Sequence, residues 1–441
     1  MSEKIWDSLK TSFWFIPISM VIAVLLLAVS MIALDRQVQL EGVRVFGALV
    51  PKGTQSAGTL LSAIATSILT VAGSVFSIAI VAIQLASGQF GPRMLRDFMK
   101  NRVNQITFGA CSATFTYAVV VLWSIEDTSE LSFTPQISVF VGLIITILTV
   151  GTLIYFVHSV ADSVHADNLI ARIGRDLEET IERFFPSDNV GPAQRRVCEV
   201  DSNFEADAIT IPAQMSGYIQ KIDLQKLTEI ATHNNLIIKL AYRPGQFVVE
   251  NSAIAYAQTT QQSESIKQLD FDLQKQINQT FTCGDQRKSE YDVEFPIKQL
   301  VEIAIRAISP AVNDPFTAIR CIDRLSVHLC QIISKPPAKA YQFDTANTLR
   351  LILEPVTFDS LVDAAFNQIR QYGKTDVAVT IRLLEGLETI GHQAQNNKQR
   401  QPLLRQIEMV NRASQDPNNI AEENDRKDAF NQYKLALRAL S

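Results

Sequence analysis

The sequence predicts a mainly α integral membrane protein with four transmembrane helices, followed by a cytoplasmic α+β region that ends in a helical domain. Residues 1–160 hold four long apolar runs, whereas residues 165–441 carry nearly all of the Gln, Asn, Asp, Glu and Lys. From Pro296 onward, apolar residues recur at helical spacing to the end of the chain. A chain of 441 residues has room for two or three such domains.

Four apolar runs are long enough to cross a bilayer, which takes about 20 residues. They lie at about 13–34, 56–87, 106–125 and 137–158, and together they define a transmembrane domain over residues 1–160. The first run follows basic residues, as in a signal peptide. We interpret it as an uncleaved span, because it is too long for a signal peptide and no small-residue cleavage site follows it.

Basic residues in the short loops set the expected orientation. The loop between the second and third runs carries Arg93, Arg96, Lys100 and Arg102, whereas "EDTSELSFTPQ" between the third and fourth runs has none. This bias predicts that both termini and the second loop lie in the cytoplasm, although the first loop is also basic. In a ring of subunits the four residues would favour anions at the inner mouth of a pore, but the ordinary positive-inside bias is the simpler explanation.

The second run, "SAGTLLSAIATSILTVAGSVFSIAIVAIQLASG", is rich in small and hydroxyl-bearing residues. At 100° per residue, its polar and small residues fall within an arc of about 100°. These residues, here called the polar stripe, are Thr59, Ser62, Thr66, Thr70, Gly73, Ser77, Gln84 and Ser87. Two interpretations stay open: close helix packing in lipid, or the lining of a water-filled path.

The exit of the fourth run places His158, Asp162 and His165 at i, i+4 and i+7 on one helix face. Imidazole and carboxylate groups are suitable ligands for zinc or a similar divalent ion. A solvated helix exit explains the same residues and is the favoured interpretation. The sequence leaves any cofactor unknown.

The chain after the fourth run divides into a connecting helix and two soluble segments. Residues 161–186, with "DNLIARIGRDLEETIERFF", predict an amphipathic helix. Residues 195–260 predict a small β domain, because period-two patterns flank glycine turns. Residues 261–441 predict a helical cytoplasmic domain. Its expected helices lie near 297–308, 315–333, 344–353, 358–371, 374–391, 401–414 and 419–440.

Two segments of the β domain, "SGYIQKID" and "YRPGQFVVENSAIAYA", are similar to the half-repeats of biotinyl/lipoyl-like barrel domains. The likeness implies a small barrel-like fold. The carrier lysine of that family is missing, so a barrel used for packing or for sensing a ligand is the better expectation.

Charge and cysteine usage argue against a nucleic-acid-binding protein and against a disulfide-stabilised one. The net charge is −5, and no basic-aromatic pattern indicates nucleic acid as a partner. Five scattered cysteines without a CxxC pair fit a reducing compartment better than a disulfide framework.

The stretch "ISPAVNDPFTA" (308–318) has the features of a corner between two helices. Pro310 ends the upstream helix, and Asp314 can cap a downstream helix that starts at Pro315. A direct binding role for Asn313 and Asp314 is the less favoured alternative. No nucleophile elbow, phosphate loop or HExxH motif accompanies them, so we predict a non-enzyme without catalytic residues.

Four motifs together resemble a bacterial family of predicted membrane proteins, the domain of unknown function 2254. The motifs are "QLASGQFGPRMLRDFMKN" (84–101), "SGYIQKID" (216–223), "RPGQFVV" (243–249) and "QLVEIAIRAISPAVNDPFTA" (299–318). The resemblance implies an inner-membrane helical bundle with a cytoplasmic region, and it supplies no activity.

Two functions follow as expectations. The favoured one is a homo-oligomeric channel whose second span lines the path and whose cytoplasmic domain forms a vestibule or gate. The alternative is a membrane-anchored sensor or scaffold that binds a ligand or partner. Expected partners are membrane lipid, further copies of the chain, and ions or a small ligand.

Overall fold

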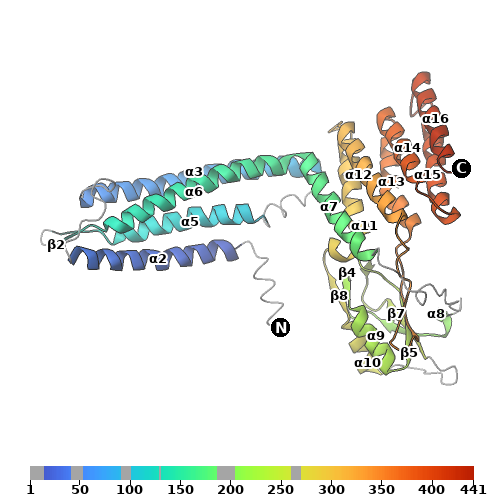
Figure 1. Ribbon diagram of the computed structural model, residues 1–441, viewed down its shortest axis with the longest axis horizontal. Helices are drawn as coiled ribbons and strands as arrows, with labels where there is room; N and C mark the ends of the chain where they lie inside the picture. Colours follow the sequence, from blue (N-terminus) through green and yellow to red (C-terminus); the bar gives the residue numbers. More distant parts are fainter. Residues whose placement is uncertain (1–13, 41–52, 91–100, 129–130, 186–203, 260–269) are drawn as a thin grey trace. The chain divides into compact units, whose positions relative to one another are not determined.

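The computed structural model describes residues 14–40, 53–90, 101–128, 131–185, 204–259 and 270–441. The chain divides into two compact units, Met1–Leu169 and Ile170–Ser441, and each unit is described by itself. The described part of the first unit is helical apart from one short hairpin, whereas the second contains larger sheets together with helices (Figure 1).

In its described residues, the first unit has four long helices: α2 (Phe15–Leu40), α3 (Thr54–Phe90), α5 (Arg102–Trp123) and α6 (Gln136–Val164). Each is long and apolar enough to cross a membrane, so helices occupy all four predicted spans and remain candidates to cross it. Helix α5 packs against the other three, and α6 also packs against α2 and α3 (Figure 1). A short hairpin of β1 (Glu126–Thr128) and β2 (Leu131–Phe133) lies between α5 and α6 in the chain.

Small residues and hydroxyl groups join the helices of this bundle. Gly109 of α5 lies against Pro17 and Met20 of α2, where any side chain would push the helices apart. The hydroxyls of Thr114 and Thr149 form a hydrogen bond of 2.6 Å between α5 and α6. Both contacts are typical of helix packing in lipid.

A buried carboxylate fixes the start of α6. Asp35, near the end of the membrane-spanning part of α2, accepts hydrogen bonds from the backbone N–H groups of Ile137 and Ser138, both at 2.8 Å. It also accepts from the hydroxyl of Ser138 at 2.6 Å. These donors belong to the first turn of α6, whose N–H groups have no partner within the helix. Asp35 therefore acts as an N-terminal cap supplied by another helix.

Helix α7 (Ala166–Phe184) has the amphipathic pattern that its sequence predicts. Leu177 and Ile181 are fully buried. On the second unit, Thr180 Oγ1 donates to the carbonyl of Ser289 at 3.2 Å, and Arg183 donates to the carbonyl of Glu290 at 2.7 Å. The C-terminal half of α7 is thereby attached to the segment that precedes the helical stack.

The strands of the second unit form two open sheets. The five-stranded sheet has the order β3 (Ile209–Pro212), β7 (Ala253–Thr259), β5 (Leu236–Leu240), β10 (Leu349–Ile352) and β9 (Tyr341–Phe343). The three-stranded sheet has the order β6 (Phe247–Val248), β4 (Gly217–Ile222) and β8 (Phe281–Gly284). Three helices accompany them: α8 (Phe204–Asp207), α9 (Leu224–His233) and α10 (Phe271–Asn278).

Two expectations about this region are wrong. The strands do not close into a barrel, because β4 pairs with β6 and β8 in one sheet while β5 pairs with β7 and β10 in another. The helix expected near 344–353 is instead strand β10, which pairs in parallel with β5, Leu351 opposite Ile238. A short apolar run such as "LRLIL" does not distinguish a strand from a helix by periodicity alone.

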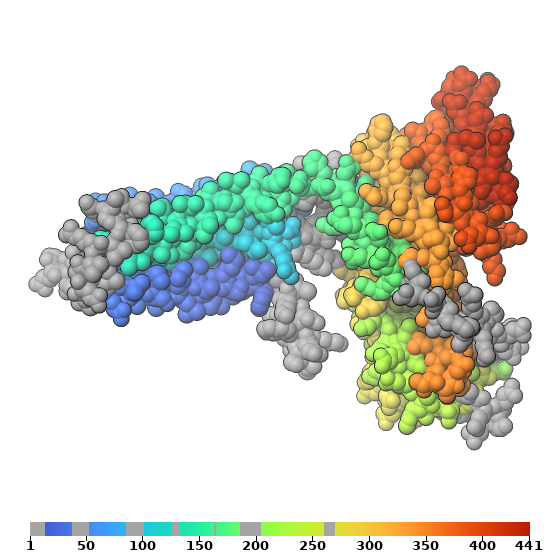
Figure 2. All heavy atoms as spheres, viewed as in Figure 1, coloured from blue at the N-terminus to red at the C-terminus, as the bar shows by residue number. Residues whose placement is uncertain are grey.

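Six helices form the rest of the second unit, after the short 3₁₀ helix Ser289–Tyr291. They are α11 (Glu294–Ala307), α12 (Pro315–Ile333), α13 (Phe358–Gly373), α14 (Val377–Gly391), α15 (Asn397–Ser414) and α16 (Glu423–Arg438). Alternate helices contact one another: α11 packs against α13 and α13 against α15, while α12 packs against α14 and α14 against α16. The helices thus form a stack of hairpins in two rows, similar in organisation to a helical solenoid. Figure 2 draws the atoms of these residues in colours from yellow to red.

The stretch 308–318 is a corner between α11 and α12, as predicted. Asp314 accepts from the N–H of Thr317 at 3.1 Å and from its hydroxyl at 2.6 Å, and Pro315 occupies the first turn of α12. Helix α11 ends at Ala307, and the carbonyl of Ala307 accepts from the N–H of Asp314 at 2.8 Å. Asn313 has a left-handed backbone, with φ +52°.

Candidate functional site

The polar stripe of α3 faces away from its own bundle. The members with a described side-chain environment are all exposed: Thr59, Ser62, Thr66, Thr70, Gly73, Ser77 and Gln84. The side chain of Ser87 lies outside the described residues. The buried side of α3 is apolar and comprises Ala57, Leu61, Ile64, Ala65, Ile68, Ala72, Ala79 and Ile83. At about 100° per residue, these buried residues lie on the opposite side of the helix from the stripe.

Among the described residues of the stripe, the side-chain hydrogen bonds stay within α3. Thr59 donates to the carbonyl of Gln55, and Thr70 to the carbonyl of Thr66, each at 2.8 Å. In the described part of the chain, no hydrogen bond joins a stripe side chain to α2, α5 or α6. The hydroxyl contacts that do join the bundle lie elsewhere, such as Thr114 with Thr149.

The outward direction of the stripe bears on the two interpretations that the sequence left open, close helix packing and the lining of a water-filled path. Packing between helices of the same chain does not explain the stripe, because its described members point out of the bundle. An outward polar surface within a membrane-spanning helix has three candidate neighbours, namely lipid, water and a second copy of the chain. Hydrocarbon offers the hydroxyl and amide groups no hydrogen-bond partner.

The basic residues expected beyond the inner end of α3 are described only in part. Arg93, Arg96 and Lys100 lie outside the described residues. Arg102 is the first residue of α5 and is exposed. A role of this group at a pore mouth therefore stays a prediction.

The candidate metal-binding triad, the less favoured interpretation of the helix exit, is not assembled. His158 Nε2 lies 3.6 Å from Asp162 Oδ2, and both side chains are exposed. Helix α6 ends at Val164, and His165 follows with an extended backbone, so the i, i+7 spacing no longer places it on the same helix face. Among the residues that the structure describes, no group of three His, Cys, Asp or Glu side chains could hold a metal ion.

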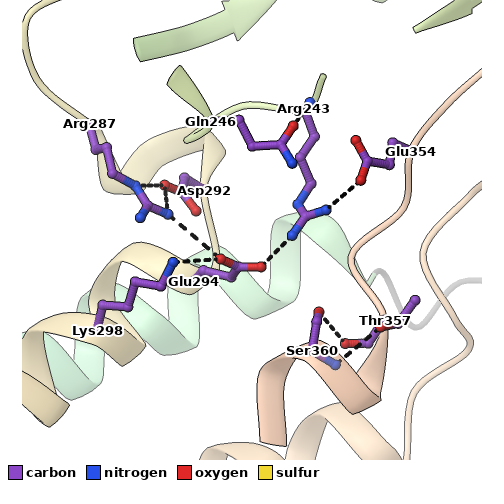
Figure 3. Close-up of polar contacts among 9 residues, drawn as sticks. All are labelled: Arg243, Gln246, Arg287, Asp292, Glu294, Lys298, Glu354, Thr357 and Ser360. Carbon is purple, nitrogen blue, oxygen red and sulfur yellow. Dashed lines mark hydrogen bonds and ion pairs between the residues drawn. The ribbon is translucent and has the colours of Figure 1, made fainter. Parts of the chain in front are cut away.

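A cluster of ion pairs in the second unit was not identified from the sequence. Arg243 Nη2 lies 2.5 Å from Glu294 Oε1, and Arg243 Nη1 lies 3.1 Å from Glu354 Oε1 (Figure 3). On the other side, Arg287 pairs with Asp292 at 2.6 Å, and Lys298 pairs with Glu294 at 3.0 Å. Cluster members thus come from the loops that follow β5 and β10, from the segment between β8 and α11, and from the first two turns of α11.

Burial and neighbouring charge act in opposite directions on the two buried carboxylates. Burial raises the pKa of Asp292, against the opposing effect of Arg287. Burial would also raise the pKa of Glu294, but the hydrogen bonds and charges of Lys298 and Arg243 outweigh it and lower that pKa. Glu294 is therefore held as a carboxylate at the centre of the cluster.

The cluster lies beside two of the motifs noted in the sequence. Gly217 and Tyr218 of "SGYIQKID" pair with Val248 and Phe247 of "RPGQFVV". In the second motif, the side chain of Gln246 accepts from the backbone N–H of Arg243 at 2.7 Å, which fixes the turn that carries this arginine. The Arg-Pro-Gly turn at Arg243 was the one local feature of the sequence that pointed to this cluster. The acidic partners of Arg243, Glu294 and Glu354, are distant in the sequence.

The fold, with its four candidate spans and a second unit of sheets and helices, indicates a multi-pass membrane protein. The family described as "Predicted membrane protein (DUF2254)" matches residues 10–389, and the chain belongs to this family. An uncharacterized protein of Mycobacterium bovis and one of Mycobacterium tuberculosis are each 28% identical to it over 370 residues, which cover 84% of this chain and 70% of each relative. No solved structure matches.

Proposed function

We propose that the protein is a homo-oligomeric channel of the inner membrane in which α3 lines the path. One observation carries the proposal: the polar stripe faces outward from a four-helix bundle whose own contacts are made by the opposite, apolar side of α3. Several copies arranged around an axis would direct their stripes toward shared water. The stripe would then meet hydrogen-bonding partners that lipid does not offer.

The remaining parts of the chain take complementary roles in this proposal. Both termini and the second unit lie in the cytoplasm, and the second unit forms a vestibule or gate. The stripe carries hydroxyl and amide groups and no charge, so its chemistry favours hydrated solutes without fixing the sign of a conducted ion. The proposal assigns no catalytic residue.

Conductance of the purified full-length chain in planar bilayers tests the proposal. Thr66→Leu places a bulky apolar group on the stripe and should remove most of the conductance. Ser67→Leu is the matched control, because Ser67 is an exposed hydroxyl at the same depth that lines an apolar groove between α3 and α6 instead. Absence of conductance under varied ionic conditions, or equal effects of the two variants, would contradict a path along the stripe.

A second function, a membrane-anchored sensor or scaffold, is favoured by a different observation. The second unit contains a cavity and a stack of helical hairpins, and stacks of this kind present extended binding surfaces. This function predicts ligand binding by the second unit without conductance. A bilayer experiment that is silent, combined with selective thermal stabilisation by a ligand, would favour it over the channel.

A further inference from the structure

A cavity of about 430 Å³ lies within the second unit. Its walls come from the last turn of α7, the ends of β4 and β5, the segment before α11, and the loops that flank the β9–β10 hairpin. The volume falls within the range of about 300–1,000 Å³ that is typical of small-molecule sites. The cavity adjoins the ion-pair cluster, because Arg243, Asp292 and Glu354 belong to both.

Most of the wall is apolar and aromatic. It includes Phe184, Leu240, Tyr242, Tyr291, Leu353 and Pro355. The hydroxyls of Tyr242 and Tyr291 have no hydrogen-bond partner among the described residues, although the ring of Tyr291 lies below Lys221 Nζ at 5.5 Å. A flat apolar molecule would find both contact area and hydrogen-bonding groups here.

The charges on the wall leave one cation without a partner. Arg183, Arg243 and Lys339 contribute three positive charges, and Asp292 and Glu354 two negative charges, which gives a net charge of +1. Arg243 is held by Glu294 and Glu354, and Asp292 is held by Arg287. Arg183 lies 3.9 Å from Glu290. Lys339 pairs with no acidic side chain in the described part of the chain.

We propose that this cavity binds a small aromatic carboxylate. The ring of the ligand contacts the apolar wall that includes Tyr242 and Leu353, and its carboxylate pairs with the ammonium group of Lys339. The fixed ion pairs around Arg243 give the site a rigid border, since none of those side chains needs to reorient. This binding function is independent of the channel, and it stands whether or not the chain conducts.

The ligand would also restrain the end of α7. Arg183 and Phe184 form part of the wall, and the last turn of α7 is attached by the contacts of Thr180 and Arg183 to residues 289–290. A molecule in the cavity adds contacts to this turn. Helix α7 follows α6 after a single residue, so the restrained segment directly continues the fourth span.

Calorimetric titration of the full-length protein in lipid nanodiscs tests the proposal, with empty nanodiscs as the blank. The probe is 2-naphthoate, and its neutral analogue 2-naphthamide has the same ring system. We expect saturable binding of one 2-naphthoate per chain. The affinity for 2-naphthamide should be about tenfold lower, because the amide loses one charge-assisted contact. Hydrogen exchange at residues 181–184 should slow when 2-naphthoate is present.

Four variants separate the site from general effects. Lys339→Met should lower the affinity for 2-naphthoate to that of the amide, and Lys339→Arg should restore it. Lys374→Met, at an exposed lysine outside the cavity, is the matched control. Ala338→Trp fills the cavity from a loop residue and should abolish binding of both probes without lowering the unfolding temperature. Equal binding of acid and amide, equal effects of the two lysine variants, or no saturable binding would overturn the proposal.

Discussion

Gly245 lies against the carboxylate of Asp292. Its backbone has φ +92°, and a β-carbon at this residue would overlap the Oδ2 and Cγ atoms of Asp292. The side chain of Asp292 is only 4% exposed and is held by Arg287 at 2.6 Å. The turn that carries Arg243 and the ion pair of Asp292 therefore fix each other in place.

Gly245→Ala should destabilise the second unit by about 3 kcal/mol, because it adds both left-handed strain and an overlap with a buried carboxylate. The thermal unfolding midpoint of the full-length protein measures the effect. Gly174→Ala is the control: a β-carbon there makes ordinary contact with His328 at 3.5 Å, and alanine favours the helix. A Gly245→Ala protein as stable as the control would contradict the packing of this turn.

Asp35→Ala should destabilise the transmembrane unit by about 3 kcal/mol, since it leaves two backbone N–H groups of α6 without their charged acceptor. Hydrogen exchange in the first turn of α6 should accelerate at the same time. The control is Asp162→Ala, which removes an exposed carboxylate near the other end of α6. Unchanged exchange at Ile137 and Ser138 in the Asp35 variant would show that the cap is not formed.

The corner at 308–318 predicts opposite effects at two neighbouring residues. Asp314→Ala should cost about 1 kcal/mol, because α12 loses its cap. Asn313→Gly should gain about 0.5 kcal/mol, because glycine adopts a left-handed backbone without strain. Thermal unfolding midpoints measure both changes. If Asn313→Gly instead removed conductance or binding at unchanged stability, the corner would have a direct functional role.

His328 predicts a pH dependence of the second unit. Burial against α7 lowers the pKa of His328 below its usual value of 6.5, and this effect exceeds the opposing hydrogen bonds to Arg324 and Gly174 and the charge of Glu178. The unfolded state then binds more protons, so stability should be full above about pH 6.5 and fall as the pH drops below it.

Unfolding midpoints at pH 7.5, 6.5 and 5.5 measure this dependence. His328→Gln should flatten it, whatever its effect on the absolute midpoint. His392→Gln, at an exposed histidine, is the control for removing an imidazole. Identical pH profiles for the wild type and His328→Gln would contradict the role of this residue.

Local signals were sufficient for the four spans and for the corner. The four spans follow from uninterrupted apolar length, and the Asp314 cap follows from an Asp-Pro pair before an apolar stripe. The sheets were not predictable in the same way. Leu351 pairs with Ile238 across more than a hundred residues, and no feature of "LRLIL" specifies that partner. The expected barrel failed for this reason, because strand order is set by such distant pairs.

The candidate site shows the same division between local and distant information. Helical spacing placed the polar stripe on one face of α3, but only the packing of α5 and α6 against the other face shows that the stripe points outward. Arg243 and Glu294 are likewise unremarkable in the sequence, since they meet only when β5 and α11 are both in place. Helical spacing predicts that His158, Asp162 and His165 share one face. It does not predict that α6 ends before His165, and this break separates His165 from the other two.

Single-particle imaging of the full-length protein in lipid nanodiscs tests the central claim most directly. The account predicts a cyclic assembly of identical chains with α3 of every copy at the axis and the polar stripe lining an opening. A monomer, a dimer without an axial opening, or an assembly in which the stripe faces lipid would contradict it.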